Sequence, residues 1–401
     1  MNIKYTSRFE RFLYNTCEIG ECFIDKIRQA QKHIYIANWL FDPSEDEKEL
    51  ILSKCEEGVK VFVITFDNIT YDIKKNIIKH ENFQIKHVKY SHYNPLRRFI
   101  MKLESRFHLM FTNRKEKFQK DQLDCIYSMH QRYALIDDKC FILSGTDFFQ
   151  NDSFYLHETA IQFNEPGKDI ISFCKENFET DGDASIRSNY FFGNFKEFNT
   201  EFKAIKSIIE NTEKFLFISQ QYFNVYSNEI GGIIADLVKK KDEVRVVFVV
   251  ESDFIDEPSF FYQGYFKSML NLSMKFFKHK LTGKQLERLL ICSVREVGGK
   301  PFFNHSKLIV SDHSKLILTS SNFHSNSFVE NRERELGTLL IDGSVEMIER
   351  KLFEMFTGEK INDSGEIFRA INESKNIKIL WNEFYPKKVL YSILYFFMFI
   401  T

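Results

Sequence analysis

The sequence is poor in the residues that mark disordered or loop-rich proteins. Proline occurs 6 times and glycine 16 times in 401 residues, whereas disordered chains are enriched in such residues. The formal net charge is −1, so the chain as a whole lacks the excess of cations typical of a general nucleic-acid binder. Phenylalanine, by contrast, occurs 44 times. The composition therefore predicts a dense aromatic core and a length sufficient for two or three domains.

Other absences limit the cellular locations and the cofactors that we expect for this protein. The seven cysteines form no C-x-x-C pair, and Cys55, Cys140 and Cys292 fall in or near apolar runs, which predicts buried reduced thiols. The first eight residues lack the apolar region of a signal peptide, so we expect a cytoplasmic protein that at most lies peripherally on a membrane. The histidines show no metal-ligand spacing, and neither G-x-x-x-x-G-K-[ST] nor G-x-G-x-x-G occurs. We therefore expect no metal and no cofactor.

What is present is one compact group of reactive side chains. His305, Lys307 and Asp312 are spaced as H-x-K-x₄-D, and Ser320-Ser321-Asn322 follows shortly after. Alternating apolar residues on either side of Asp312 predict a two-stranded hairpin. His305 and Lys307 are two residues apart, so on a strand their side chains share one face. That face combines an imidazole, which can attack or donate a proton, with an ammonium, which can hold an anion.

The same group occurs twice. His130, Arg132 and Asp137 each precede their counterparts by 175 residues, and Asp147 precedes Asn322 by the same interval. Self-similarity at a fixed interval indicates a duplicated structural unit. One imidazole and one cation in each copy are hard to explain by packing alone, so the repeat favours a shared catalytic site.

The two motifs resemble those of the phospholipase D superfamily, which carries two H-x-K-x₄-D motifs in one chain. The second copy, with Asn322, Ser327 and Glu335, is similar to the C-terminal motif of eukaryotic-type phospholipase D. The first copy departs from the pattern at Arg132, which replaces lysine, and its ending at residues 144–147 resembles the G-G-x-D ending of that group. The resemblance, which extends to cardiolipin synthase-like proteins, implies an α/β fold of two pseudo-symmetric halves. Each half would hold a mixed sheet flanked by helices, and the two would join into one bilobal unit.

The resemblance also implies a role for each motif residue. One imidazole would attack phosphorus and form a phosphohistidine, and the other would protonate the leaving alkoxide. By analogy with family members whose N-terminal histidine attacks, we expect His130 to be the nucleophile and His305 the acid. The predicted catalytic set is His130, His305, Arg132, Lys307, Glu158 and Glu335. The cations would hold phosphate oxygens with Asn322 and Ser320 as substrate-binding residues, and the glutamates would orient the imidazoles.

The acidic residues near the motifs have different expected roles. Glu333 fits the bacterial spacing and Glu335 the eukaryotic one; we prefer Glu335, because the residues that follow it match those after Glu158. Asp137 and Asp312 are expected to be structural, with hydrogen bonds inside their hairpins. Asp147 stands where an oxygen-binding asparagine is usual, and its carboxylate would repel a phosphate, so we also expect it to be structural.

The repeat extends beyond the motifs. Residues 21–31 and 199–211 have helical periodicity, and the apolar runs at 32–41, 59–64, 214–223 and 244–249 read as buried strands. This alternation predicts an α/β protein with a mixed sheet in each half. We expect the halves to occupy residues 1–180 and 197–358, with a connection near 179–196 and a C-terminal extension at 359–401.

Two segments bear on the substrate. Residues 97–120 interleave eight cations with four phenylalanines, a pattern compatible with a solvated helix, anionic lipid headgroups or nucleic acid. The apolar run at 389–400 is shorter than the roughly 20 residues that span a bilayer, so it packs on the domain or enters a membrane interface. We predict a monomeric enzyme that acts on membrane phospholipid. A nuclease of the same family is the alternative, and a non-catalytic membrane-binding protein is the third reading.

Overall fold

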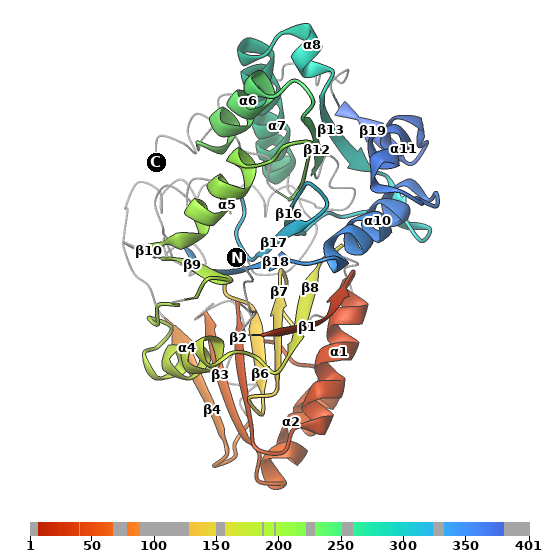
Figure 1. Ribbon diagram of the computed structural model, residues 1–401. Helices are drawn as coiled ribbons and strands as arrows, with labels where there is room; N and C mark the ends of the chain where they lie inside the picture. The colour runs from red at the N-terminus through yellow and green to blue at the C-terminus, as the bar shows by residue number, and fades with distance from the viewer. Residues whose placement is uncertain are drawn as a thin grey trace.

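The computed structural model describes residues 7–39, 41–66, 78–88, 128–149, 157–186, 188–195, 198–221, 229–250, 260–323 and 333–380. In this part of the chain, two large β-sheets with flanking helices form two lobes (Figure 1). The arrangement confirms the predicted α/β class with two repeated halves. The basic segment at 97–120 and the apolar run at 389–400 lie outside the described residues.

The first lobe is built on a seven-stranded sheet of order β1-β8-β7-β6-β2-β3-β4. Its strands are β1 (Arg8–Leu13), β2 (His33–Asn38), β3 (Lys60–Phe66), β4 (Phe83–Val88), β6 (Tyr133–Ile136), β7 (Cys140–Ser144) and β8 (Ala160–Asn164). Its helices are α1 (Thr16–Gln29), α2 (Glu45–Glu56) and α4 (Lys168–Glu179). β2, β3 and β4 run parallel, whereas β6 pairs antiparallel with both β2 and β7. The first motif therefore lies where the parallel and antiparallel parts of the sheet meet.

The second sheet has the order β10-β9-β18-β17-β16-β11-β12-β13-β19. Its strands are β9 (Phe191–Phe195), β10 (Phe198–Asn199), β11 (Phe215–Gln220), β12 (Arg245–Val250), β13 (Leu289–Val294), β16 (Lys307–Ser311), β17 (Lys315–Thr319), β18 (Glu333–Ile341) and β19 (Ile377–Ile379). Its helices are α5 (Thr200–Glu210), α6 (Ile230–Lys240), α7 (Phe260–Lys280), α8 (Gly283–Leu286), α10 (Ser344–Thr357), the short 3₁₀ turn η2 (Ser364–Glu366) and α11 (Ile367–Glu373). A small ribbon pairs β14 (Glu296–Val297) with β15 (Lys300–Pro301).

The order β18-β17-β16-β11-β12-β13 repeats β8-β7-β6-β2-β3-β4 of the first lobe, so the duplication seen in the motifs extends through the sheets. Two strands lie beyond the expected second half. β9 precedes the boundary at 197, and β19 falls inside the expected extension at 359–401, yet both pair within the second sheet.

Local sequence signals explain how individual elements form. α1 starts after Asn15, whose side chain accepts a hydrogen bond from the backbone of Glu18, and α2 starts after Ser44 with a capping box to Glu47. Every residue of β11, β13 and β16 is buried. Central strands covered on both faces are expected to be continuously apolar. The motif strand β16 is therefore held in the interior of its lobe.

One hydrophobic cluster joins the two lobes. It combines Phe141 and Phe163 of the first sheet with Phe217 of the second sheet and with Phe353 and Phe356 of α10. Two further clusters lie within single lobes. Full burial of one such side chain stabilises the fold by about 1.5–3 kcal/mol, so the shared aromatic cluster holds the two halves together.

The three cysteines expected to be buried thiols lie within the described ranges. Cys55, Cys140 and Cys292 are buried free thiols, as expected. None of the helices placed by the structure combines the length and the apolar character that crossing a bilayer requires.

Asp137 and Asp312 form a matched pair of structural anchors. The Asp137 carboxylate accepts backbone hydrogen bonds of 2.7–3.0 Å from the three residues at 31–33, just before and at the start of β2. The Asp312 carboxylate does the same with residues 213–215 before β11, over the same range of distances. The expectation of hydrogen bonds inside the hairpin was wrong about the partner. Each aspartate instead ties its hairpin turn to the start of the neighbouring central strand.

Candidate active site

Each motif histidine is held by the backbone of the opposite half. The His130 amide donates to the carbonyl of Arg334 (2.8 Å), and the His305 amide donates to the carbonyl of His157 (3.1 Å). Beside these bonds, β5 (Ser128–Met129) runs parallel to the start of β18, and His157 forms a parallel bridge with Asn304. Backbone hydrogen bonds therefore connect the two halves at two places, one at each motif histidine.

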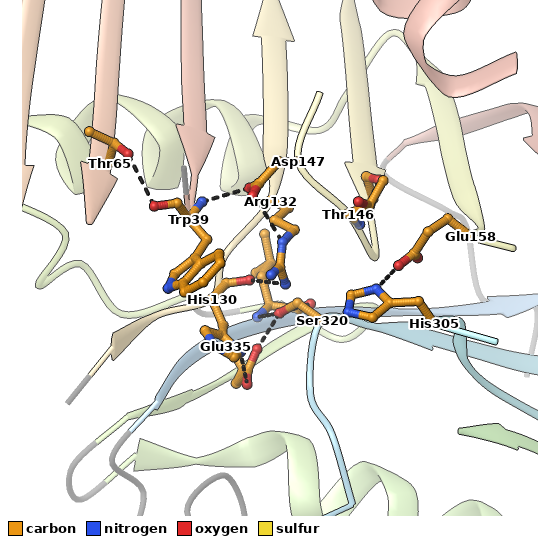
Figure 2. Close-up of polar contacts among 12 residues, drawn as sticks. Trp39, Thr65, His130, Arg132, Thr146, Asp147, Glu158, His305, Ser320 and Glu335 are labelled. Atoms are coloured by element: carbon orange, nitrogen blue, oxygen red, sulfur yellow. Dashed lines mark hydrogen bonds and ion pairs between the residues drawn. The ribbon is translucent and has the colours of Figure 1, made fainter. Parts of the chain in front are cut away.

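The side chain of each motif histidine also contacts a residue of the opposite half. His130 Nδ1 lies 3.4 Å from Glu335 Oε1, and His305 Nδ1 contacts Glu158 Oε1 (Figure 2). Both glutamates are fully buried. Because Nδ1 of each imidazole faces a carboxylate, Nε2 is the nitrogen left for chemistry. Both predicted orienting glutamates thus lie against a motif histidine, each against that of the other half, so neither half contains a complete set.

The cation of each motif folds back onto its own histidine. Lys307 Nζ donates to the carbonyl oxygen of His305 (2.6 Å) and lies 3.2 Å from its Nδ1. Arg132 Nη1 donates to the carbonyl oxygen of His130 (3.2 Å). Both cations are buried. Each cation is therefore placed beside an imidazole, where it can stabilise an anion bound there.

Asp147 explains the arginine of the first motif. Its Oδ1 lies 3.4 Å from Arg132 Nε and also accepts a 2.8 Å hydrogen bond from the backbone of Trp39. A planar guanidinium can use one edge for such a carboxylate and keep the other for a ligand. Asp147 therefore anchors Arg132 to the end of β2, and it offsets part of the arginine's charge.

The second half carries a serine and an asparagine at its matching loop. The Ser320 hydroxyl donates to Glu335 Oε2 (2.5 Å) and accepts from the backbone of Leu336 (3.0 Å). Ser320 is fully buried, so its hydroxyl serves Glu335 rather than standing free for substrate as expected. Asn322 is also buried, and its Oδ1 has no hydrogen-bond partner among the residues that the structure describes. The Oδ1 of Asn322 can thus accept a hydrogen bond from a ligand.

The electrostatics couple the two motifs. Burial lowers the pKa of His305 well below its usual range, and the charge of Lys307 acts in the same direction. Arg132 and His130 of the other half add to this effect. The Glu158 carboxylate acts in the opposite sense, because it stabilises an imidazolium. The influence of first-half charges on a second-half histidine is what a single composite site requires.

Glu201 is a buried acid that the sequence analysis missed. It lies at the start of α5, is fully buried, and accepts hydrogen bonds from the hydroxyls of Thr319 and Ser321, the latter at 2.6 Å. Thr319 and Ser321 alternate along the loop with Ser320 and Asn322. Glu201 therefore fixes the first pair by hydrogen bonds, and the second pair belongs to the site. The run of three hydroxyl residues at 319–321 is the sequence signal that could have indicated a buried acceptor here.

Trp39 and Arg334 were missed as well. The Trp39 ring lies edge-on to His130, with 6.1 Å between ring centroids (Figure 2). Arg334 is buried, donates to the Asp181 carbonyl (2.8 Å) and pairs with Asp183. It therefore ties β18, beside His130, to the end of the first lobe. Neither role has a local sequence pattern, because both depend on contacts between distant segments.

Among the residues that the structure places, no three or more His, Cys, Asp or Glu side chains form a group able to hold a metal ion.

Comparison with known proteins agrees with this geometry. A family model described as "Cardiolipin synthase, PLD-like domain" matches residues 23–181 and 205–347, one segment in each half. The chain belongs to the phospholipase D superfamily. No curated protein sequence matches it.

Two solved structures share the fold of this superfamily member. Phosphatidylserine synthase of Haemophilus influenzae Rd KW20 superposes with a TM-score of 0.61 at 14% identity, over 97% of this chain and 92% of that chain. Polyphosphate kinase of Porphyromonas gingivalis superposes with a TM-score of 0.54 at 11% identity, over 98% of this chain and 53% of that one. At these identities the likeness concerns the fold alone.

Proposed function

We propose that this protein is a phospholipase D-type phosphodiesterase or phosphatidyltransferase that cleaves or exchanges the headgroup of membrane phospholipids. The observation that carries the proposal is the crossed arrangement of His130 with Glu335 and His305 with Glu158. Two oriented imidazoles with a cation beside each are what in-line displacement at an anionic phosphodiester needs.

The reaction proceeds in two displacements. Neutral His130 attacks phosphorus through Nε2, the bond from phosphorus to the leaving oxygen breaks, and His305 gives its proton to that oxygen. His305 then takes a proton from water or an acceptor alcohol, whose oxygen attacks the phosphohistidine and releases His130. Lys307 and Arg132 hold the nonbridging oxygens throughout. Water as acceptor gives hydrolysis, and an alcohol gives transfer of the phosphatidyl group.

The protonation of His305 depends on the substrate. In the empty site, burial and the neighbouring cations lower its pKa. A bound phosphodiester anion offsets the charge of these cations, while the Glu158 carboxylate remains in contact with Nδ1. Substrate binding therefore favours the imidazolium form of His305 that an acid must have.

Several observations support a lipid substrate. The matching family model is named for cardiolipin synthase, and one structural neighbour is a phosphatidylserine synthase. The net charge of −1 gives little general attraction to nucleic acid. The cations of 97–120 are interleaved with phenylalanines, which suits a membrane interface where rings enter the acyl region and cations meet phosphates.

The nuclease alternative rests on the same basic segment, since eight cations could also follow a nucleic-acid backbone. The non-catalytic reading is disfavoured by the site itself. A protein that only bound membranes would have no need of two crossed imidazole–carboxylate pairs, both with buried glutamates.

The test compares substrates side by side. Purified protein is incubated with headgroup-labelled phospholipid vesicles, with and without a primary alcohol, and with labelled single-stranded and duplex DNA. Release of headgroup or formation of a phosphatidyl alcohol, lost in His130→Asn, supports the proposal, and a parallel reaction in EDTA tests the expected independence of metals. Degradation of DNA without lipid turnover would establish the nuclease reading.

Membrane docking is tested separately by sedimentation with anionic liposomes. The intact chain is compared with a chain ending at Lys388 and with a charge-reversed 97–120 segment. We expect both changes to reduce binding, because weak anchors act in pairs. A protein that turns over soluble phosphodiesters but sediments with none of the liposomes would contradict the peripheral-membrane prediction.

A further inference from the structure

The loops that follow the two motifs have the same backbone. Gly145 donates its amide to the carbonyl of Thr159 (3.0 Å), and Ser320, 175 residues later, donates to the carbonyl of Leu336 (3.1 Å). The hydroxyls flanking these positions also match. The amide of Thr146 donates to Ser144 Oγ (3.0 Å), and that of Ser321 donates to Thr319 Oγ1 (2.9 Å). The two loops are therefore a matched pair that differs at one critical side chain.

That side chain decides what each orienting glutamate contacts. In the second half, Ser320 Oγ donates to Glu335 Oε2 (2.5 Å) while Glu335 Oε1 faces His130. In the first half the position is Gly145, and a Cβ built there would lie 2.6 Å from Glu158 Oε2. Glu158 is buried against glycine and has no hydrogen-bond partner beyond its contact with His305 among the residues placed by the structure.

The difference matters because a hydroxyl that donates to a carboxylate takes up part of its negative charge. Glu335 divides its charge between Ser320 and His130, whereas Glu158 directs its charge to His305. The undivided charge of Glu158 therefore opposes the lowering of the His305 pKa by burial and by Lys307, whereas Glu335 shares its charge between two partners.

We infer that Ser320 is a positioning residue that separates the roles of the two histidines: it takes up part of the charge of Glu335, the carboxylate that faces His130, whereas the glycine at 145 leaves Glu158 to His305 alone. The inference rests on the proposed phosphodiester chemistry and adds the physical cause of the division of labour. A pair of identical halves would have two equivalent imidazoles, and the serine–glycine difference removes that equivalence.

The test uses Ser320→Ala, which deletes only the hydroxyl oxygen, with Ser321→Ala as the matched control. The Ser321 hydroxyl donates to Glu201, away from the glutamate of the histidine pair. Without the serine, Glu335 stabilises the His130 imidazolium more strongly. We expect the acid limb of the kcat/KM profile for a soluble phosphodiester to move up by about 0.5 to 1 pH unit in Ser320→Ala, as loss of one hydrogen bond predicts, and to stay in place in Ser321→Ala.

A second readout does not need turnover. Carbon-13 NMR of labelled histidine side chains, assigned with His130→Asn, gives the protonated fraction of His130 at a fixed pH near 6.5. We expect a larger fraction in Ser320→Ala than in the intact chain, and a return to the original value in Ser320→Thr, which keeps a hydroxyl. If the protein turns over no phosphodiester, the proposed function fails, yet this measurement still decides the inference.

Two results would overturn the inference. One is an unchanged acid limb and an unchanged protonated fraction in folded Ser320→Ala, which would mean that the hydroxyl serves the loop alone. The other is a trapped phosphohistidine that maps to His305 of the intact chain by mass spectrometry. An adduct on His130, together with the shift, supports the inference.

Discussion

The two halves share their backbone but not their polar chemistry. Each has the same six-strand order, a motif aspartate that ties the hairpin to the neighbouring strand, and a histidine that donates its amide to the other half. The side chains at the site then diverge. The first half pairs Arg132 with Asp147, whereas the second half has Lys307 and Asn322 at the equivalent positions. Duplication therefore supplied the frame, and single substitutions made the two sides of the site unequal.

The contacts that only hold the fold have diverged even further. In the first half the turn residue Asp138 pairs with Lys175 of α4 (2.7 Å), and in the second half the turn residue His313 pairs with Glu349 of α10 (2.5 Å). The signs of the two partners are exchanged between halves. A hairpin can be fastened to its helix by either polarity, but a phosphate must be met by cations. The motif cations Arg132 and Lys307 thus keep their sign, whereas the scaffold pair exchanges its signs.

The largest expected effect comes from removing either imidazole. His130→Asn and His305→Asn should each lower kcat/KM by at least about 10³-fold, because one loses the nucleophile and the other the acid. Initial rates with labelled phospholipid measure this, and circular dichroism checks the fold. Substantial activity in either variant would mean that one half works alone and that the composite site is wrong.

We expect replacement of the two motif cations to lower kcat/KM by unequal factors. Lys307→Met should lower kcat/KM by about 10²-fold, the range of a hydrogen bond to a charged group. Arg132→Met should cost about tenfold, because Asp147 already offsets part of the arginine's charge. The double variant Arg132→Lys with Asp147→Asn rebuilds the second-half pair in the first half, and we expect it to lower KM. Equal losses at Arg132 and Lys307 would argue against the asymmetry.

The pH dependence should differ between the free and the substrate-bound enzyme. In the free enzyme the pKa of His305 is lowered, so its acid form is lost at a lower pH; bound phosphodiester raises that pKa. The kcat/KM profile reports the free enzyme and the kcat profile the complex. The alkaline limb of kcat/KM should therefore lie at lower pH than that of kcat. Coincident limbs would show that the cations do not control His305.

The smallest expected effect concerns stability at His157, the counterpart of Arg334. His157 is fully buried between Phe302 and Phe356, neither ring nitrogen has a hydrogen-bond partner within the described structure, and burial lowers its pKa to about 3. The unfolded chain binds this proton below about pH 6.5 and the folded chain does not. The histidine therefore costs stability increasingly as pH falls from 6.5 towards 3.

Between pH 7 and pH 4.5 this histidine should account for a loss of about 2.5 kcal/mol in the free energy of unfolding. His157→Phe, which keeps an aromatic ring in the same apolar surroundings, should shrink the difference between urea titrations at the two pH values. A difference as large in the variant as in the intact chain would show that His157 does not titrate in this way.

The sequence by itself determined the superfamily, the two-half α/β architecture and the chemical groups of the site. These follow from local periodicity and from a repeat interval of 175 residues, and both are spacings that can be measured in the sequence alone. The sequence also indicated both orienting glutamates, since Glu158 and Glu335 stand at recognisable distances from their motifs. It could not indicate which histidine each one faces.

Only the tertiary structure decided that partnership, because the glutamate of each half meets the histidine of the other across the interface. It also assigned Asp147 to Arg132, Ser320 to Glu335 and Glu201 to the loop at 319–322. Contacts between side chains of different elements leave no periodic trace, whether the residues are 15 positions apart, as Ser320 and Glu335 are, or 120, as Glu201 and Ser321 are. Sequence patterns therefore reveal which groups are present but not which ones are in contact. The two motifs repeat along the chain, but the different contacts of their orienting glutamates are what we propose to distinguish the two histidines.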